Sequence, residues 1–130
     1  MAPSPHKTTV LVVEDDPAVR VLYRHALMAA GYAVVAVEDG IDALRAIERR
    51  VPDAVILDLG LPRLGGRDVQ HELMSHAETS RVPIVVVTGM DVSDLNSADF
   101  ACVLRKPIDP EQLVLAVDNC LRQARRGYTV

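Results

Sequence analysis

The stretch that decides the fold is Leu11–Arg20, which reads LVVEDDPAVR. It begins as an apolar run typical of a buried strand and ends on three consecutive acids, Glu14, Asp15 and Asp16. Proline follows at once, and an aspartate before a first-turn proline is typical of a helix start, so we favour capping over chemistry for Asp16. Buried neighbouring carboxylates repel and lose hydration, so the acids also predict a cation among them.

Short apolar runs rich in Val, Ile, Leu and Ala recur along the chain. They predict five strands, at Thr9–Val13, Ala33–Val37, Ala54–Leu57, Ile84–Val87 and Ala101–Leu104. Helical patterns occupy Pro17–Ala30, Ile41–Arg50, Gly66–Ser75 and Pro110–Arg125. Near-continuous apolar runs fit strands that are buried on both faces, and their alternation with helices is typical of a doubly wound α/β domain with a parallel sheet. Right-handed crossovers then place helices on both faces of the sheet.

Composition bounds the class of protein. A chain of 130 residues with 49% hydrophobic and 25% charged residues suits one globular domain. The net charge of −4 argues against a nucleic-acid partner. No apolar run approaches the roughly 20 residues of a membrane span, and the N-terminus lacks a signal-peptide core, so we expect a cytoplasmic protein without membrane contact. The two cysteines, which have no CxxC spacing, are expected to be reduced core thiols.

Polar residues follow the central strands as well as the first. Asp58 comes directly after the third strand, Thr88 after the fourth and Lys106 after the fifth. Ligands of doubly wound sheets bind outside the carboxyl ends of the strands, so we expect these side chains and the acids after the first strand at one edge. Taken alone, Thr88 could be an ordinary β-branched strand residue, and Lys106 could be an ordinary surface lysine. Chance would seldom place the acids, the threonine and the lysine at the same edge of the sheet, however.

These residue types point to phosphoryl chemistry. Mg²⁺ prefers oxygen ligands, and Asp15 and Asp58, with Glu14 nearby, supply them. A carboxylate can also act as a nucleophile and form an aspartyl phosphate. Phosphoryl oxygens then need a metal on one side and a cationic group on another, a role that suits Lys106, with Thr88 as a further donor.

The acids after strand one, DLGLP with Asp58, VTG with Thr88 and RKP with Lys106 resemble the receiver domain of two-component response regulators, of the chemotaxis-regulator type. The likeness runs from about Thr8 to Arg122. It implies a five-stranded parallel sheet of flavodoxin-like order 2-1-3-4-5. We expect residues 1–8 to form a flexible tail, 9–126 the receiver domain and 127–130 a C-terminal tail.

The resemblance also implies roles for single residues. Asp58 is expected to be the phosphoacceptor. Asp15, Asp58 and the backbone oxygen of Gly60 are expected to bind Mg²⁺ directly, with Glu14 acting mostly through water and Mn²⁺ as a substitute metal.

The motifs after the fourth and fifth strands carry further implied roles. Thr88 and Lys106 are expected to contact the phosphoryl group. The peptide bond between Lys106 and Pro107 is expected to be cis, which is inexpensive only before proline.

The chain departs from the receiver pattern in two places. The strand-five position three before the lysine, usually aromatic, is Val103, and Phe100 lies three residues too early, so the aromatic switch is in doubt. The segment between Met90 and Asp99 is short and rich in Asp, Ser and Asn, which favour turns over helix interiors. We therefore predict that the fourth helix of the family is missing or reduced to one turn within a mobile loop, and that the output surface is non-standard.

The function expected is that of a single-domain response regulator. It takes phosphate from a sensor histidine kinase or histidine phosphotransferase, undergoes self-phosphorylation and autodephosphorylation, and either docks to a downstream protein or passes the phosphate on. We do not expect a conventional enzyme. The sequence leaves the oligomeric state open between a monomer and a phosphorylation-dependent dimer. One alternative is a pseudo-receiver scaffold without phosphorylation. A haloacid-dehalogenase-type phosphatase is disfavoured because Asp58 is followed by Leu59 and Gly60, where that type needs DxD.

Overall fold

The computed structural model describes residues 7–61, 65–89 and 100–126. Within these residues lie five parallel strands and four helices. The strands are β1 (Thr9–Val13), β2 (Ala33–Val37), β3 (Ala54–Leu57), β4 (Ile84–Thr88) and β5 (Cys102–Arg105). They form a single sheet in the order β2-β1-β3-β4-β5, which confirms the predicted doubly wound fold.

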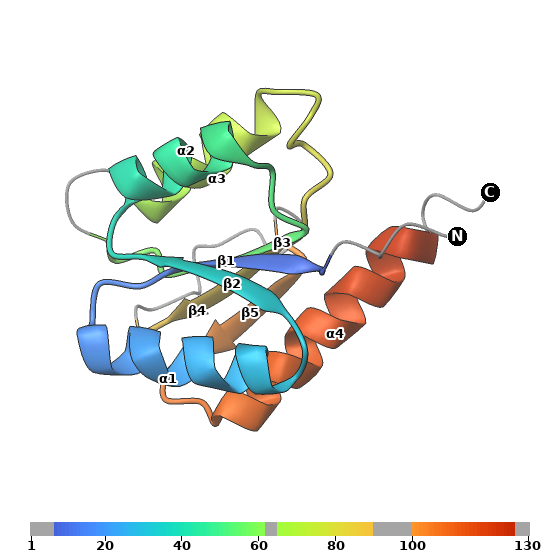
Figure 1. The fold of residues 1–130 in the computed structure, drawn as a ribbon. Helices are drawn as coiled ribbons and strands as arrows, with labels where there is room; N and C mark the ends of the chain where they lie inside the picture. Colours follow the sequence, from blue (N-terminus) through green and yellow to red (C-terminus); the bar gives the residue numbers. More distant parts are fainter. Residues whose placement is uncertain (1–6, 62–64, 90–99, 127–130) are drawn as a thin grey trace.

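The helices cover both faces of the sheet (Figure 1). They are α1 (Pro17–Ala29), α2 (Gly40–Arg49), α3 (Gly66–Met74) and α4 (Pro110–Arg126). Helices α1 and α4 pack on one face, and α2 and α3 pack on the other. This three-layer arrangement follows from the right-handed βαβ crossovers that connect parallel strands.

Alternating residues of β1 supply the two halves of the core. Val10 and Val12 pack with residues of α1 and α4, whereas Leu11 and Val13 pack with residues of α2 and α3. All four are essentially inaccessible to solvent. The central strands are therefore buried on both faces, which explains why the sequence shows continuous apolar runs rather than polar alternation.

Local chemistry sets the ends of α1. The Asp16 carboxylate accepts hydrogen bonds from the backbone N–H groups of Ala18 (3.0 Å) and Val19 (3.4 Å). Pro17 occupies the first turn, where a missing N–H costs nothing. Gly31 follows the helix with a φ of 101°, a conformation that side chains disfavour. The predicted capping role of Asp16 is confirmed.

Strand boundaries differ slightly from the sequence prediction. Strand β4 extends to Thr88, and β5 runs from Cys102 to Arg105 rather than from Ala101 to Leu104. Ala101, one residue before β5, still donates its N–H to the carbonyl of Ile84 on β4 (2.9 Å), so hydrogen bonding between the two strands begins one residue before β5 itself. Lys106 therefore follows β5 directly.

Some expectations fall on parts of the chain outside the described residues. These include the shortened helix between Met90 and Asp99, most of the tail at residues 1–8 and the tail at 127–130. Within the part of the chain that the structure describes, no helix is both long and apolar enough to cross a membrane. Cys102 and Cys120 are free thiols, as expected.

Candidate functional site

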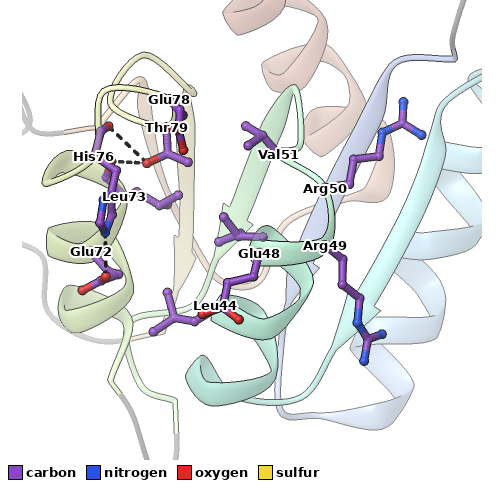
Figure 2. A pocket seen from close by; sticks show the side chains of 11 residues that line it. Leu44, Glu48, Arg49, Arg50, Val51, Glu72, Leu73, His76, Glu78 and Thr79 are labelled. Atoms are coloured by element: carbon purple, nitrogen blue, oxygen red, sulfur yellow. Dashed lines mark hydrogen bonds and ion pairs between the residues drawn. The ribbon is translucent and has the colours of Figure 1, made fainter.

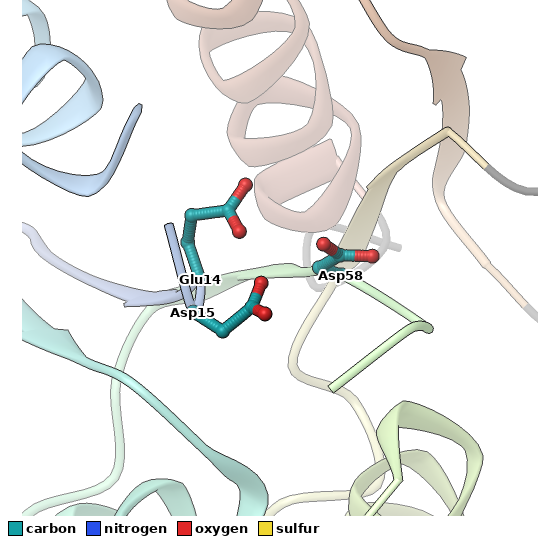
Figure 3. A group of neighbouring side chains, drawn as sticks. All are labelled: Glu14, Asp15 and Asp58. Atoms are coloured by element: carbon teal, nitrogen blue, oxygen red, sulfur yellow. The ribbon is translucent and has the colours of Figure 1, made fainter. Parts of the chain in front are cut away.

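Three carboxylates converge at the carboxyl edge of the sheet (Figure 3). Glu14 and Asp15 follow β1, and Asp58 follows β3. Each contributes an oxygen atom, and these oxygens lie within 4.8 Å of one another. Glu14 and Asp58 are buried, with 1% and 8% of their surface exposed, whereas Asp15 is exposed. The structure thus brings together the acids that the sequence predicted to meet.

Lys106 supplies a positive charge to this cluster. Its ammonium group donates a hydrogen bond to Oδ2 of Asp58 (3.1 Å) and another to Oε1 of Glu14. The lysine side chain is 24% exposed, so it reaches the buried acids from the rim of the site. A cation therefore stands between two of the three carboxylates and reduces their repulsion.

The pKa values of the pair follow from burial and this contact. Burial raises the pKa of Glu14, and the hydrogen bond from Lys106 offsets part of that rise. Burial alone would lower the pKa of Lys106, but its hydrogen bonds to Glu14 and Asp58 leave that pKa above its ordinary value. The lysine is therefore held in its charged form at neutral pH.

Backbone N–H groups complete the hydrogen bonding of the two buried acids. Gly60 donates its N–H to Oδ1 of Asp58 (2.9 Å), and Asp16 donates its N–H to Oε2 of Glu14 (3.2 Å). The Asp58 side chain consequently has one oxygen bonded to the loop after β3 and the other to Lys106. This fixes its carboxylate at the edge of the sheet.

Thr88 and Lys106 are positioned by the last two strands. Thr88 is fully buried at the end of β4, and its carbonyl accepts a hydrogen bond from the backbone N–H of Lys106 (2.9 Å). The peptide bond between Lys106 and Pro107 is cis, in agreement with the expectation. Val103 pairs with Val86 on β4 and is half-buried, while Phe100 is buried in the core on the side of α2 and α3.

Two residues near the site escaped the sequence analysis. The Arg20 guanidinium donates to the backbone carbonyls of Glu14 (2.9 Å) and Asp15 (3.4 Å), which ties α1 to the acidic turn. The sequence offered one indication of this role, because Arg20 lies one helical turn after Asp16 and therefore close to the acidic turn. Tyr23 is buried, which raises its pKa, while the positive charge of Lys106 acts in the opposite direction. Nothing in the sequence distinguishes Tyr23 from an ordinary core residue of α1.

A second acidic group, Glu38, Asp39 and Asp42, lies at the start of α2. The Asp39 carboxylate accepts a hydrogen bond from the N–H of Asp42 (2.9 Å), so it serves as a helix cap. Helix capping accounts for its burial. This group provides a useful control for experiments on the site.

A hollow of about 480 Å³ lies away from this site, between the carboxyl ends of α2 and α3 (Figure 2). Helix carboxyl ends lead into the amino ends of the strands, so this hollow lies at the opposite edge of the sheet from Asp58. Its walls include Leu44, Leu73 and an exposed pair in which His76 and Glu72 lie 2.9 Å apart. The hollow therefore takes no part in the acidic site.

Comparison with known proteins identifies the family. The model of the response regulator receiver domain matches residues 10–118. The chain belongs to the response regulator receiver domain family. Phosphorylation and magnesium binding are general features of this family.

Among similar proteins, the response regulator MprA of Mycobacterium sp. (strain KMS) is 39% identical over 121 residues, covering 88% of this chain and 50% of MprA. The regulatory protein LuxO of Vibrio vulnificus is 36% identical over 123 residues, covering 88% of this chain and 26% of LuxO. The chain thus spans about half the length of MprA and a smaller part of LuxO. These relatives match it over the receiver domain.

Solved receiver domains share the fold closely. The receiver domain of the sensor histidine kinase PA1611 from Pseudomonas aeruginosa PAO1 superimposes with a TM-score of 0.80 at 28% identity, covering 90% of this chain and 99% of that one. That structure holds a magnesium ion in its active site cleft. A sensor protein from Polaromonas sp. JS666 gives a TM-score of 0.82 at 28% identity, covering 89% and 97%.

Proposed function

We propose that Asp58 accepts a phosphoryl group, in a Mg²⁺-dependent reaction, from the phosphohistidine of a sensor histidine kinase or a histidine phosphotransferase. The observation that carries this proposal is the Lys106 ammonium held between the carboxylates of Glu14 and Asp58, beside Asp15. Burying so much negative charge around one lysine costs folding free energy. A site that must bind a cation and then an anion accounts for that cost.

The donor set fits a hard divalent cation. Glu14, Asp15 and Asp58 present carboxylate oxygens within 4.8 Å of one another, and Mg²⁺ favours sites with one or two carboxylates and several waters. Asp15 and Asp58 would bind the ion directly, together with the Gly60 carbonyl, and Glu14 would act through water. When bound, the metal neutralises charge on the transferring phosphoryl group.

The transfer itself needs little from the protein beyond positioning. A carboxylate oxygen of Asp58 forms a bond to phosphorus as the phosphorus–nitrogen bond of phosphohistidine breaks. The imidazole leaves with the electron pair and takes up a proton, and an acyl phosphate remains on Asp58. The hydrogen bonds from Gly60 and Lys106 hold the carboxylate in place before the reaction.

Lys106 and Thr88 are suited to bind the new phosphoryl group. The lysine already lies 3.1 Å from an Asp58 oxygen, so a short movement lets its ammonium pair with a phosphoryl oxygen. Thr88 ends the neighbouring strand and offers a hydroxyl to another oxygen. We propose that these contacts convert the chemical event into a change in protein binding, either by docking to a downstream protein or by passing the phosphate to a phosphotransferase.

Intact-mass spectrometry after incubation with acetyl phosphate or phosphoramidate tests the proposal. We expect the protein to gain one phosphoryl group with Mg²⁺, and none when the metal is chelated. The Asp58→Asn variant should gain none under either condition.

The matched control is Asp42→Asn, which makes the same chemical change in the other acidic group. It should be phosphorylated like the wild type. A phosphoryl group that persists in Asp58→Asn, or that forms equally without a divalent metal, would exclude Asp58 as the metal-assisted acceptor.

A further inference from the structure

Strand β2 is an edge strand without a single charged residue. It reads AVVAV, from Ala33 to Val37, and its neighbour in the sheet is β1. Natural edge strands are usually protected by charged residues, proline or bulges, because unpaired backbone groups invite another strand. Val35, in the middle of β2, is 45% exposed. This edge therefore lacks the usual protection.

The backbone of β2 leaves hydrogen-bonding groups pointing outward. Ala33 donates its N–H to the Thr8 carbonyl (2.9 Å), and the Val37 carbonyl accepts from Glu14 (3.1 Å), so these residues face β1. Alternate residues of a parallel strand direct their N–H and C=O groups to opposite sides. Val34 and Ala36 therefore direct theirs to the open edge, where Figure 1 shows neither α1 nor α2 lying across the strand.

Arginines gather beside this edge. A groove of about 390 Å³ lies between β2 and α2. Its lining includes Val35, three arginines and two acids, namely Arg20, Arg45, Arg49, Glu38 and Asp42. An adjoining hollow of about 150 Å³ shares Val35 and Arg49 and adds Arg50. Figure 2 shows the side chains of Arg49 and Arg50 pointing away from α3 and toward β2. The two hollows together have four arginines and two acids in their lining, a positive balance on a chain of net charge −4.

We propose that β2 binds an extended acidic segment of a partner protein, which adds to the sheet as a further strand. Its backbone would bond to Val34 and Ala36, as in the strand-addition mode of peptide recognition. Alternate side chains of an added strand face the same side as Val35, so Asp or Glu at those positions would reach Arg45, Arg49 and Arg50. The binding does not require phosphorylated Asp58.

Other occupants fit less well. A second copy pairing through β2 would bring two sets of arginines together. A nucleic acid would leave the backbone edge of β2 unused.

The probe is a fluorescein-labelled, end-capped peptide of alternating Glu and Val, and the measurement is fluorescence anisotropy. We expect it to bind and to slow amide exchange at Val34 and Ala36. A peptide that is N-methylated at two adjacent central residues, one Glu and one Val, keeps its charge but loses a strand hydrogen bond whichever way the added strand runs, and it should bind about tenfold more weakly. A Lys/Val peptide should not bind.

On the protein, Arg49→Glu should weaken binding of the Glu/Val peptide about fivefold or more, as expected for a lost ion pair and a new repulsion. Arg122→Glu on α4 changes the net charge equally and should leave the affinity within about twofold of the wild type, because that charge is distant and screened. Equal losses in both variants, equal binding of the N-methylated peptide, displacement by duplex DNA or no binding would each overturn the proposal.

Discussion

Lys106 is the residue on which the stability of the acidic site depends most. Among the described residues, Lys106 is the basic residue that forms ion pairs with Glu14 and with Asp58, and both of these acids are buried. Removing one partner of such a cluster leaves negative charge without compensation, which costs more than the pair itself contributes.

We therefore expect Lys106→Met to lower the free energy of unfolding by about 1–3 kcal/mol without divalent metal at neutral pH. Mg²⁺ should restore more stability to this variant than it adds to the wild type, because the ion replaces the missing charge. Urea unfolding with and without Mg²⁺ measures both effects. The control is Lys7→Met, at the only other lysine in the sequence, which should change the free energy of unfolding little. An equal loss of stability in Lys7→Met would contradict the account.

Gly66 is required by the close approach of α3 to the loop after Asp58. A Cβ atom at this position would lie 2.6 Å from the Asp58 carbonyl oxygen and 2.7 Å from Cα of Leu59. Both are backbone atoms, so the side chain cannot be accommodated by a rotamer change. The glycine therefore has a packing role beside the phosphoacceptor.

Gly66→Ala should destabilise the protein by about 1–3 kcal/mol and slow phosphoryl incorporation, because the Asp58 loop must shift. Thermal unfolding and the intact-mass assay measure these effects. At the adjacent Gly65 an added Cβ would lie 3.4 Å from its nearest neighbour, an Asp68 oxygen. Gly65→Ala should therefore cost only about 0.5 kcal/mol, from the preference for glycine over alanine at the N-cap of α3. Comparable damage from the two variants would argue against the steric explanation.

Helix α1 depends on its cap. The Asp16 carboxylate accepts hydrogen bonds at Ala18 and Val19, and it is exposed, away from the contacts of Lys106. Asp16→Ala should lower the free energy of unfolding by about 1 kcal/mol, whereas Asp16→Asn keeps a capping oxygen and should lose less. Both variants should still take up one phosphoryl group. Loss of phosphorylation in folded Asp16→Asn would instead place Asp16 in the chemistry.

The elements of this fold could be predicted from the sequence because their signals are local. Strands buried on both faces must be apolar throughout. Asp16 and Pro17 indicate the start of α1, and Gly31 indicates its end. The end of β5 was misplaced by one residue because Arg105, although within the strand, is exposed and charged. Sequence patterns indicate burial, whereas hydrogen bonding defines a strand. Arg105 is hydrogen-bonded as part of the strand but is not buried, so the pattern missed it.

The molecule as a whole should respond to divalent metal, because folding assembles into one donor set acids that follow β1 and β3, two strands that are neighbours in the sheet but far apart in the sequence. A ligand that binds only the folded state stabilises it, by about 2.7 kcal/mol at a concentration one hundred times its dissociation constant. We expect the unfolding temperature to rise with Mg²⁺ and to return on chelation. Asp15→Asn should reduce this response, whereas Asp42→Asn should keep it, and an equal response in the two variants would contradict the metal assignment.

Contacts between elements that are far apart in the sequence could not be predicted from the sequence alone. The strand ends indicated that Asp58, Thr88 and Lys106 would share an edge, but not that the lysine would contact Glu14 as well as Asp58. The bond from Arg20 to the acidic turn and the close approach at Gly66 depend on how helices pack on the sheet. Such packing follows from the summed shapes of many side chains rather than from a local motif.

The central claim is that the phosphoryl group resides on Asp58, and borohydride trapping tests it most directly. Borohydride reduces an acyl phosphate to an alcohol, so phosphorylated aspartate becomes homoserine, which tandem mass spectrometry locates in the chain. After incubation with acetyl phosphate and Mg²⁺, we predict homoserine at position 58 and at no other aspartate. Reduction at Asp15 or Asp16 instead, or a phosphoryl group that survives the treatment on another residue type, would contradict the account.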